Sequence, residues 1–147
     1  MILSRAFGVT VAVLLALTSP APAADTDPTP WNQEEVTAIA EQLKQATQEL
    51  YDSFYKQPTQ NIGSGQARAY QQLKHTLRRI RTESQHLAAT LTKGEGHDET
   101  RPIYGNLMGE VRNAQEDARK VFSTSPVIER ANAVRAILEK LSAYYEA

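Results

Sequence analysis

The sequence predicts an all-α protein with an up-down-up-down antiparallel four-helix bundle. Four segments carry apolar residues at alternating spacings of three and four, which is the period of one helix face. Breaks rich in glycine, proline and serine separate these segments, and no segment has the alternating pattern of a β-strand. Because each segment forms about six helical turns and the breaks are short, consecutive helices should lie antiparallel.

The first predicted helix begins in the stretch "TPWNQEE". Pro30 suits a first turn, and Asn32 with Glu35 has the capping-box pattern of a helix start. Pro58 ends the helix because proline cannot donate the helical hydrogen bond. The predicted buried stripe comprises Val36, Ile39, Leu43, Ala46, Leu50 and Phe54.

The second predicted helix follows the break "QPTQNIGSG" and ends at Gly94, a typical C-cap residue. Its predicted stripe comprises Tyr70, Leu73, Leu77, Ile80, Ser84, Leu87 and Leu91. The next stretch, "GEGHDETRP", is predicted to be a loop because of its glycines, charges and proline.

The third predicted helix ends at "STSP", where Ser125 can cap the fourth helix and Pro126 can open it. Within the third helix, Gly105 and Gly109 either permit close approach of another backbone or locally weaken the helix. The third stripe comprises Tyr104, Leu107, Val111, Ala114, Ala118 and Val121, and the fourth comprises Val127, Ala131, Val134, Leu138, Leu141 and Tyr145. Small residues that should let the core layers interdigitate are Ala46, Ser84, Ala114, Ala118 and Ala131.

Residues 1–23 are predicted to be a secretory signal peptide. Arg5 precedes an apolar run over 6–17 and a proline- and alanine-rich tract. The run is shorter than the roughly 20 residues that span a bilayer, and an Ala-Pro-Ala tripeptide supplies the small residues that a signal peptidase reads. We therefore expect cleavage after residue 23, a flexible linker over 24–30, a four-helix domain over 31–147, and a periplasmic location without a transmembrane anchor.

The composition argues against several classes of function. The formal net charge of −1 does not favour nucleic-acid binding. The sequence has no cysteine, which excludes disulfides, lipid attachment through cysteine and covalent c-type haem attachment. It also lacks a Gly-x-Ser-x-Gly elbow and a phosphate-binding glycine loop. We therefore expect a non-catalytic protein, as a monomer or homodimer.

The histidines are predicted to face solvent. If Tyr70 and Leu73 occupy core positions, His75 and His86 lie on the outer side of the second helix. Glu83 and His86 have the Glu-x-x-His spacing of di-iron bundles, but a second copy of that element is missing, so they are only weak metal candidates. His97 lies among carboxylates in a predicted loop. We expect solvated histidines and no dedicated metal site.

The second helix is also strongly basic. Its residues that could bind a partner are Arg68, His75, Arg78, Arg79, Arg81 and His86. The first helix is rich in acids, so one interpretation is that the two helices form ion pairs with each other. The alternative is an outer basic face that binds an anionic partner such as a phospholipid, a glycan or an acidic protein.

Aromatic residues gather in two places that should lie at opposite ends of the bundle. They are Tyr51, Phe54 and Tyr55 near the end of the first helix, and Tyr144 and Tyr145 near the end of the fourth. Core packing with the phenol tips reaching water explains them, because tyrosine is amphipathic. A ligand cleft or docking site for a partner is the alternative.

Three short stretches are similar in pattern to the soluble periplasmic b-type four-helix cytochromes: "LKQA", "NLMGEVRNAQEDA" and "AYYE". The chain resembles this family in architecture over the whole mature domain and in sequence only in these patches. The resemblance implies haem iron held by a methionine near the start of the first helix and a histidine near the end of the fourth. Those positions are Val36 and about Tyr145 here, so the resemblance supports the fold and argues against haem ligation in the family's mode.

Together these features predict an exported binding or interaction module without a cofactor, whose basic second helix binds a protein or an anionic envelope component. The alternative is a haem or metal carrier related to the b-type cytochromes.

Overall fold

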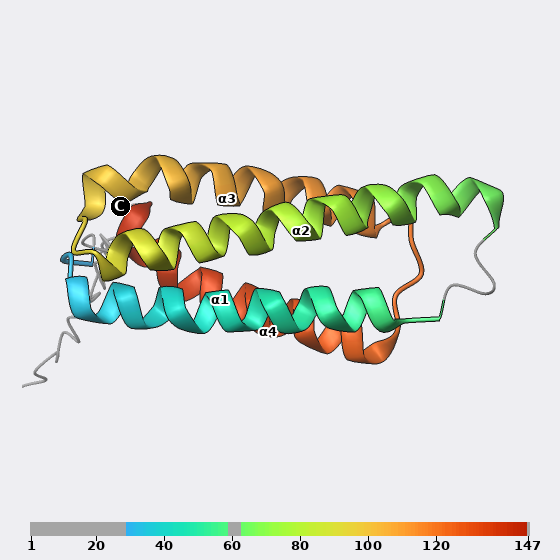
Figure 1. The fold of residues 1–147 in the computed structure, drawn as a ribbon, viewed down its shortest axis with the longest axis horizontal. Coiled ribbons are helices and arrows are strands. Elements are labelled where there is room, and N and C mark those ends of the chain that lie inside the picture. The colour runs from blue at the N-terminus through green and yellow to red at the C-terminus, as the bar shows by residue number, and fades with distance from the viewer. Residues whose placement is uncertain (1–28, 59–62, 147) are drawn as a thin grey trace, which may run out of the picture.

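A computed structural model describes residues 29–58 and 63–146. They form α1 (Gln33–Lys56), α2 (Ser64–Thr92), α3 (His97–Ala118) and α4 (Ser125–Tyr145), which run alternately up and down along one long axis (Figure 1). The predicted all-α four-helix fold is confirmed. The predicted signal peptide and most of the predicted linker lie outside the described residues.

The helices do not pack equally against one another. α1 packs along both α2 and α4, and α2 packs along α3, whereas α3 and α4 touch only sparsely. The bundle is therefore closed on three sides and open between its last two helices. None of the helices in the described residues is long and apolar enough to cross a membrane.

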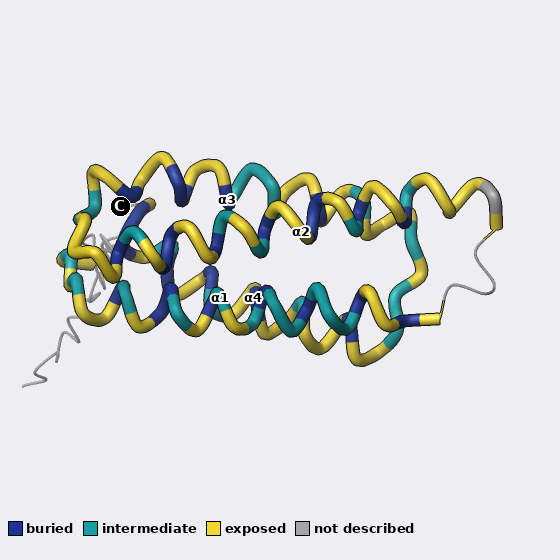
Figure 2. Tube along the Cα trace, in the orientation of Figure 1, coloured by how far each residue is buried: buried dark blue, intermediate teal, exposed yellow. Residues whose placement is uncertain are grey.

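The predicted stripes form the core, as Figure 2 shows by the dark blue residues on the inward sides of the helices. Every stripe residue of α2 is buried, including Ser84, whose hydroxyl donates to the carbonyl of Ile80. Among the predicted stripe residues of α1, Ala46 is half-buried and the others are buried. The other exceptions belong to the third and fourth stripes: Val111 of α3 and Ala131 of α4 are half-buried, and Ala118 is exposed. Val121, predicted in the third helix, is half-buried in the connection after α3, which ends at Ala118.

The predicted caps at Asn32 and Gly94 are confirmed, but α1 begins at Gln33, so Pro30 lies before the helix and not in its first turn. At the start of α1, the backbone N–H of Glu35 donates to Oδ1 of Asn32 over 3.1 Å. At the end of α2, Gly94 has a φ of 91°, which glycine adopts without strain. The N–H of Gly94 donates to the carbonyl of Leu91 and that of Glu95 to the carbonyl of Thr90, which together form a Schellman motif.

The start of α3 corrects the predicted loop over "GEGHDETRP". The helix already begins at His97, because the Glu99 carboxylate accepts from the N–H of Gly96 and the Thr100 hydroxyl donates to the Gly96 carbonyl. Pro102 consequently lies inside the helix, where it removes one backbone donor.

The start of α4 is shifted by one residue from the prediction. Thr124 is the N-cap, and its carbonyl accepts from the N–H of Ile128. Ser125 is the first helical residue rather than the cap, and Pro126 follows it. Proline tolerates either of the first two positions because its missing N–H would have no intrahelical acceptor there.

The two glycines of α3 do not mark a close backbone approach. A Cβ atom built on Gly105 or Gly109 meets nothing within 4 Å. The structure therefore contradicts close approach of another backbone and favours the other prediction, that these glycines locally weaken the helix.

Candidate functional site

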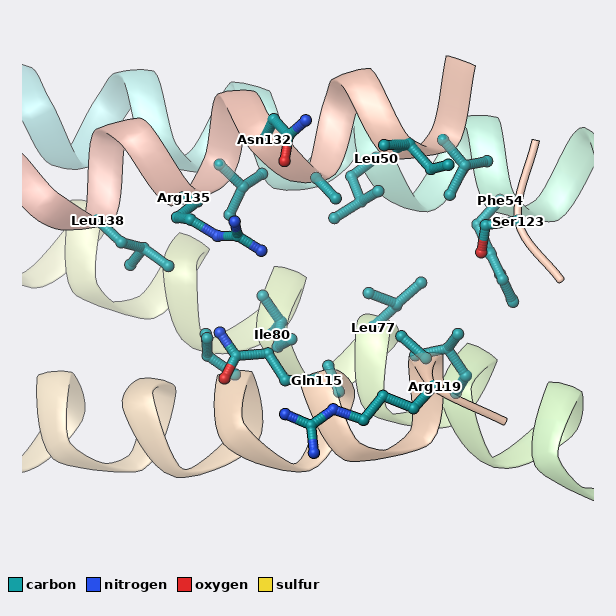
Figure 3. A pocket seen from close by; sticks show the side chains of 18 of the residues that line it. Leu50, Phe54, Leu77, Ile80, Gln115, Arg119, Ser123, Asn132, Arg135 and Leu138 are labelled. Atoms are coloured by element: carbon teal, nitrogen blue, oxygen red, sulfur yellow. The ribbon is translucent and has the colours of Figure 1, made fainter. Parts of the chain in front are cut away.

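A groove opens where α3 and α4 fail to meet. Its volume is about 940 Å³, and all four helices line it. Leu50 and Phe54 of α1 and Leu77 and Ile80 of α2 form its floor, which Figure 3 shows from close by. The apolar residues of its walls are Met108, Val111, Ala114, Ala118, Val127, Ala131, Val134 and Leu138.

The groove exists because its walls carry small side chains. Ala114 and Ala118 of α3 and Ala131 of α4 line it, and a methyl group cannot bridge two helices that stand apart. The sequence predicted that these alanines let the core layers interdigitate, but in the structure they line the groove. Near the connection from α3 to α4, Phe122 and Ile128 line the groove and are 78% and 50% exposed, so its apolar surface is open to solvent there.

Polar side chains lie at the mouth of the groove. Arg135 and Asn132 extend from α4, while Gln115 and Arg119 extend from α3 (Figure 3). Within residues 29–58 and 63–146, no ion pair engages either arginine. Of the candidate site residues predicted from the sequence, Phe54 lines this groove and the others do not; the alanines of α3 and α4 and Phe122 were the further signals.

Two carboxylates also line the groove, toward the C-terminal end of α4. Glu146 accepts a hydrogen bond from the Tyr104 hydroxyl over 2.9 Å. Glu139 lies one helical turn after Arg135. The groove is therefore basic around Arg119 and Arg135 and acidic beyond them.

An aromatic cluster closes the bundle at the end where α3 begins and α4 finishes. Tyr145 stacks on Tyr104 with ring centroids 4.4 Å apart, and Trp31 meets Tyr145 edge-on at 5.4 Å. The hydroxyls of Tyr145 and Thr100 are 2.7 Å apart. Burial raises the pKa of Tyr145, which keeps its phenol neutral. This end of the molecule is packed core rather than a cleft.

His97 belongs to the same cluster, which corrects its predicted place in a solvated loop. Its ring stacks on Tyr145 at 5.5 Å and meets Trp31 edge-on at 5.3 Å. Nδ1 lies 2.9 Å from Oδ1 of Asp98. The ring is half-buried because α3 begins at this residue and turns it toward α4.

The second aromatic group lies at the opposite end, as predicted. Phe54 is fully buried and stacks on Tyr70 at 4.7 Å. Tyr51 and Tyr55 stack on each other at 6.1 Å nearer the surface. Arg81 lies 4.3 Å above the Tyr51 ring, and Lys74 lies 4.1 Å above the Tyr55 ring. These phenol rings therefore bind cations of α2 rather than line a cleft.

The basic residues of α2 do not pair with the acids of α1 in the described part of the chain. Arg79 pairs with Glu110 of α3 instead. Glu49 of α1 pairs with Arg130 because it lies on the side of α1 that faces α4. The other acid of α1 in an ion pair, Glu41, binds Lys44 of its own helix. The predicted α1–α2 ion pairs are therefore wrong.

The remaining members of the predicted basic face are exposed: Arg68, His75, Arg78 and His86. The outward orientation predicted for the two histidines is confirmed. That this face binds an anionic partner stays a prediction.

The weak metal candidates lie apart from other ligands. Glu83 is half-buried and His86 is exposed. In the part of the chain that the structure describes, no three histidine or carboxylate side chains gather as a metal site would require. At the positions that correspond to the haem ligands, Val36 and Tyr145 are both buried in the core.

The chain was compared with known protein families, with curated proteins and with solved structures, and none of them matches it. The fold and the groove together define a class of protein, a four-helix bundle with an open, largely apolar groove. The resemblance to b-type cytochromes stays a prediction.

Proposed function

We propose that this chain is an exported, non-catalytic binding protein that holds the alkyl part of a lipid-like molecule in the groove between α3 and α4. The observation that carries this proposal is an apolar groove of about 940 Å³ between α3 and α4, the two neighbouring helices that touch only sparsely in the described residues. A volume of this size lies within the usual range of about 300–1,000 Å³ for ligand pockets.

The energetics favour an apolar occupant. The floor residues Leu50, Phe54, Leu77 and Ile80 belong to the hydrophobic core, yet they also border the groove. An alkyl chain that covers such surface gains roughly 25 cal/mol for each Å² removed from water. In a closed bundle, side chains of neighbouring helices bury this apolar surface. Here a ligand between α3 and α4 would bury it and so supply the same kind of stabilising free energy.

The groove's polar groups support binding rather than catalysis. Gln115 and Asn132 carry amides, and Arg119 and Arg135 carry guanidinium groups that stay charged at all physiological pH values. Neither group is a general base near neutral pH, and no histidine or cysteine of the described residues lines the groove. Of the two carboxylates in the lining, Glu146 already accepts from Tyr104, and Glu139 lies one helical turn from Arg135. Export is supported by the predicted signal peptide.

The proposal is tested with N-phenyl-1-naphthylamine, an uncharged probe that fluoresces in apolar sites. We expect the parent protein to bind it, and Ala131→Phe to weaken binding by about tenfold or more, because a phenyl ring at that position fills the groove. Ala133→Phe is the matched control, since Ala133 is exposed on the same helix and does not line the groove.

Circular dichroism confirms that both variants stay helical. A parent protein that does not bind the probe, or equal loss of binding in the two variants, would contradict the groove as the binding site.

A further inference from the structure

We infer that the molecule in the groove is a long-chain carboxylate, whose head group is held at the mouth by Arg119 and Arg135. This inference rests on the proposed function and identifies the chemical class of the ligand.

The groove is amphiphilic from its floor to its mouth. In Figure 3 the side chains of Leu50, Leu77 and Ile80 lie between the helices, Arg135 reaches from α4 toward α3, and Arg119 lies along α3 on the opposite wall. An alkyl chain matches the first part and a negatively charged head group matches the second. A wholly apolar molecule would gain nothing from the guanidinium groups, whereas an anionic head group binds them.

The two arginines are free to receive an anion. Arg79 and Arg130, elsewhere on the surface, pair with carboxylates of neighbouring helices, whereas no ion pair in the described residues engages Arg119 or Arg135. A guanidinium group binds a carboxylate through two parallel hydrogen bonds. Such bonds strengthen beside an apolar surface, where the effective dielectric constant is lower than in water.

The charges at the mouth favour a singly charged head group. Glu139 lies one turn from Arg135 and offsets one of the two positive charges. The second carboxylate of the lining, Glu146, already accepts from Tyr104. A carboxylate balances the single remaining positive charge, whereas a phosphate monoester would bring a charge of about −1.5 to −2.

The groove has room for the chain of such a ligand. From Arg135, beside which the head group is placed, to Ile128, which also lines the groove, α4 rises about 10 Å along its axis. Phe122 and Ile128 line the end of the groove near the α3–α4 connection and are exposed, so apolar surface is open to the rest of the alkyl chain there. The alkyl chain therefore lies along the groove, with its head group between the two arginines.

The inference is tested by displacing N-phenyl-1-naphthylamine from the full chain with oleate, oleyl alcohol and oleyl phosphate at neutral pH. We expect oleate to bind at least about tenfold more tightly than oleyl alcohol, because only oleate forms charge-assisted hydrogen bonds. Arg135→Gln and Arg119→Gln should each reduce the preference for oleate over oleyl alcohol about tenfold, because the charge-assisted hydrogen bonds to the head group are lost. Arg112→Gln is the control, since Arg112 is an exposed arginine of α3 that does not line the groove.

The outcomes separate this inference from the proposed function. If the probe binds but oleate and oleyl alcohol displace it equally well, the head-group inference fails and the groove remains a binding site. If the double variant Arg119→Gln, Arg135→Gln binds oleate as tightly as the parent protein, the head-group inference also fails and the groove remains a binding site. Tighter binding of oleyl phosphate than of oleate would overturn the carboxylate assignment. If neither the probe nor any alkyl compound binds, both proposals fail.

Discussion

The hydrogen bond from Tyr104 to Glu146 ties α3 to the last turn of the chain. Burial raises the pKa of Tyr104 above its ordinary value of 10.0, and the Glu146 carboxylate that accepts from the hydroxyl raises it further. Because the folded-state pKa is raised, the neutral phenol contributes stability in full below pH 10.0. That contribution is lost as the pH rises from there through the folded-state pKa.

We therefore expect Glu146→Gln to lower the pKa of Tyr104, because the substitution removes the negative charge beside the phenol and keeps an acceptor. The measurement is a pH titration by NMR of the protein with labelled tyrosine rings. Glu139→Gln is the control, as Glu139 is not hydrogen-bonded to the phenol in the described structure. An unchanged Tyr104 titration in Glu146→Gln would mean that burial alone sets this pKa.

At the residue scale, local patterns were the most predictable. Asn32 and Gly94 cap their helices as expected, because a cap depends on neighbours three to five residues away in the sequence. His97 was misplaced because the glycines, charges and proline around it indicate a loop, yet Pro102 lies inside α3. Ser125 was misplaced by one residue because Thr124 took the cap position in front of it. Two adjacent residues can both suit a cap, and the sequence alone does not decide between them.

The element that departs most from an ideal helix is α3. Gly105 and Gly109 lie in its interior, and a Cβ atom at either position meets open space. Glycine costs about 1 kcal/mol relative to alanine in a helix interior because it loses more conformational freedom on folding.

We expect Gly105→Ala and Gly109→Ala each to increase the free energy of unfolding by about 0.5–1 kcal/mol. Gly94→Ala is the informative contrast: the backbone φ of 91° there strains any side chain, and we expect a loss of about 1–2 kcal/mol. Urea denaturation followed by circular dichroism measures all three variants. A destabilised Gly109→Ala would show that the space beside α3 is needed for packing.

The charge pattern of α2 was predictable, but its partners were not. The position of Arg79 relative to the apolar stripe of α2 places it on the flank of that helix. Whether this flank faces α1 or α3 depends on how α2 is rotated in the bundle. The ion pair with Glu110 shows that this arginine faces α3. Arg81 likewise binds the face of the Tyr51 ring rather than a carboxylate of α1.

At the scale of the whole molecule, the sequence predicted four apolar stripes and their antiparallel order, and the structure confirms both. The groove could not be predicted in the same way. Periodicity assigns a residue such as Ala118 to an inward face, but the width of a seam depends on the summed sizes of side chains from two helices far apart in sequence. The candidate site follows from this tertiary property, and the basic face of α2 does not contribute to it.

An open seam also has a dynamic consequence along α3. In its first half Ile103, Tyr104 and Leu107 are buried, whereas in its second half Val111 is half-buried and Ala118 is exposed. Local opening requires less free energy where fewer apolar contacts must be broken. We therefore expect backbone amides in the second half of α3 to exchange with solvent deuterium at least about tenfold faster than those in the first half, a difference of about 1.4 kcal/mol in opening free energy.

Native-state hydrogen exchange followed by NMR measures this difference residue by residue. If the groove holds an alkyl chain, saturating oleate should slow exchange in the second half of α3 and at the start of α4, because the ligand supplies the contacts that the facing helix does not. The first half of α3, packed against the aromatic cluster, serves as the internal reference and should change little. Uniform protection along α3 without ligand would instead mean that α1 and α2 hold its whole length, so that the groove is a rigid opening rather than a flexible one.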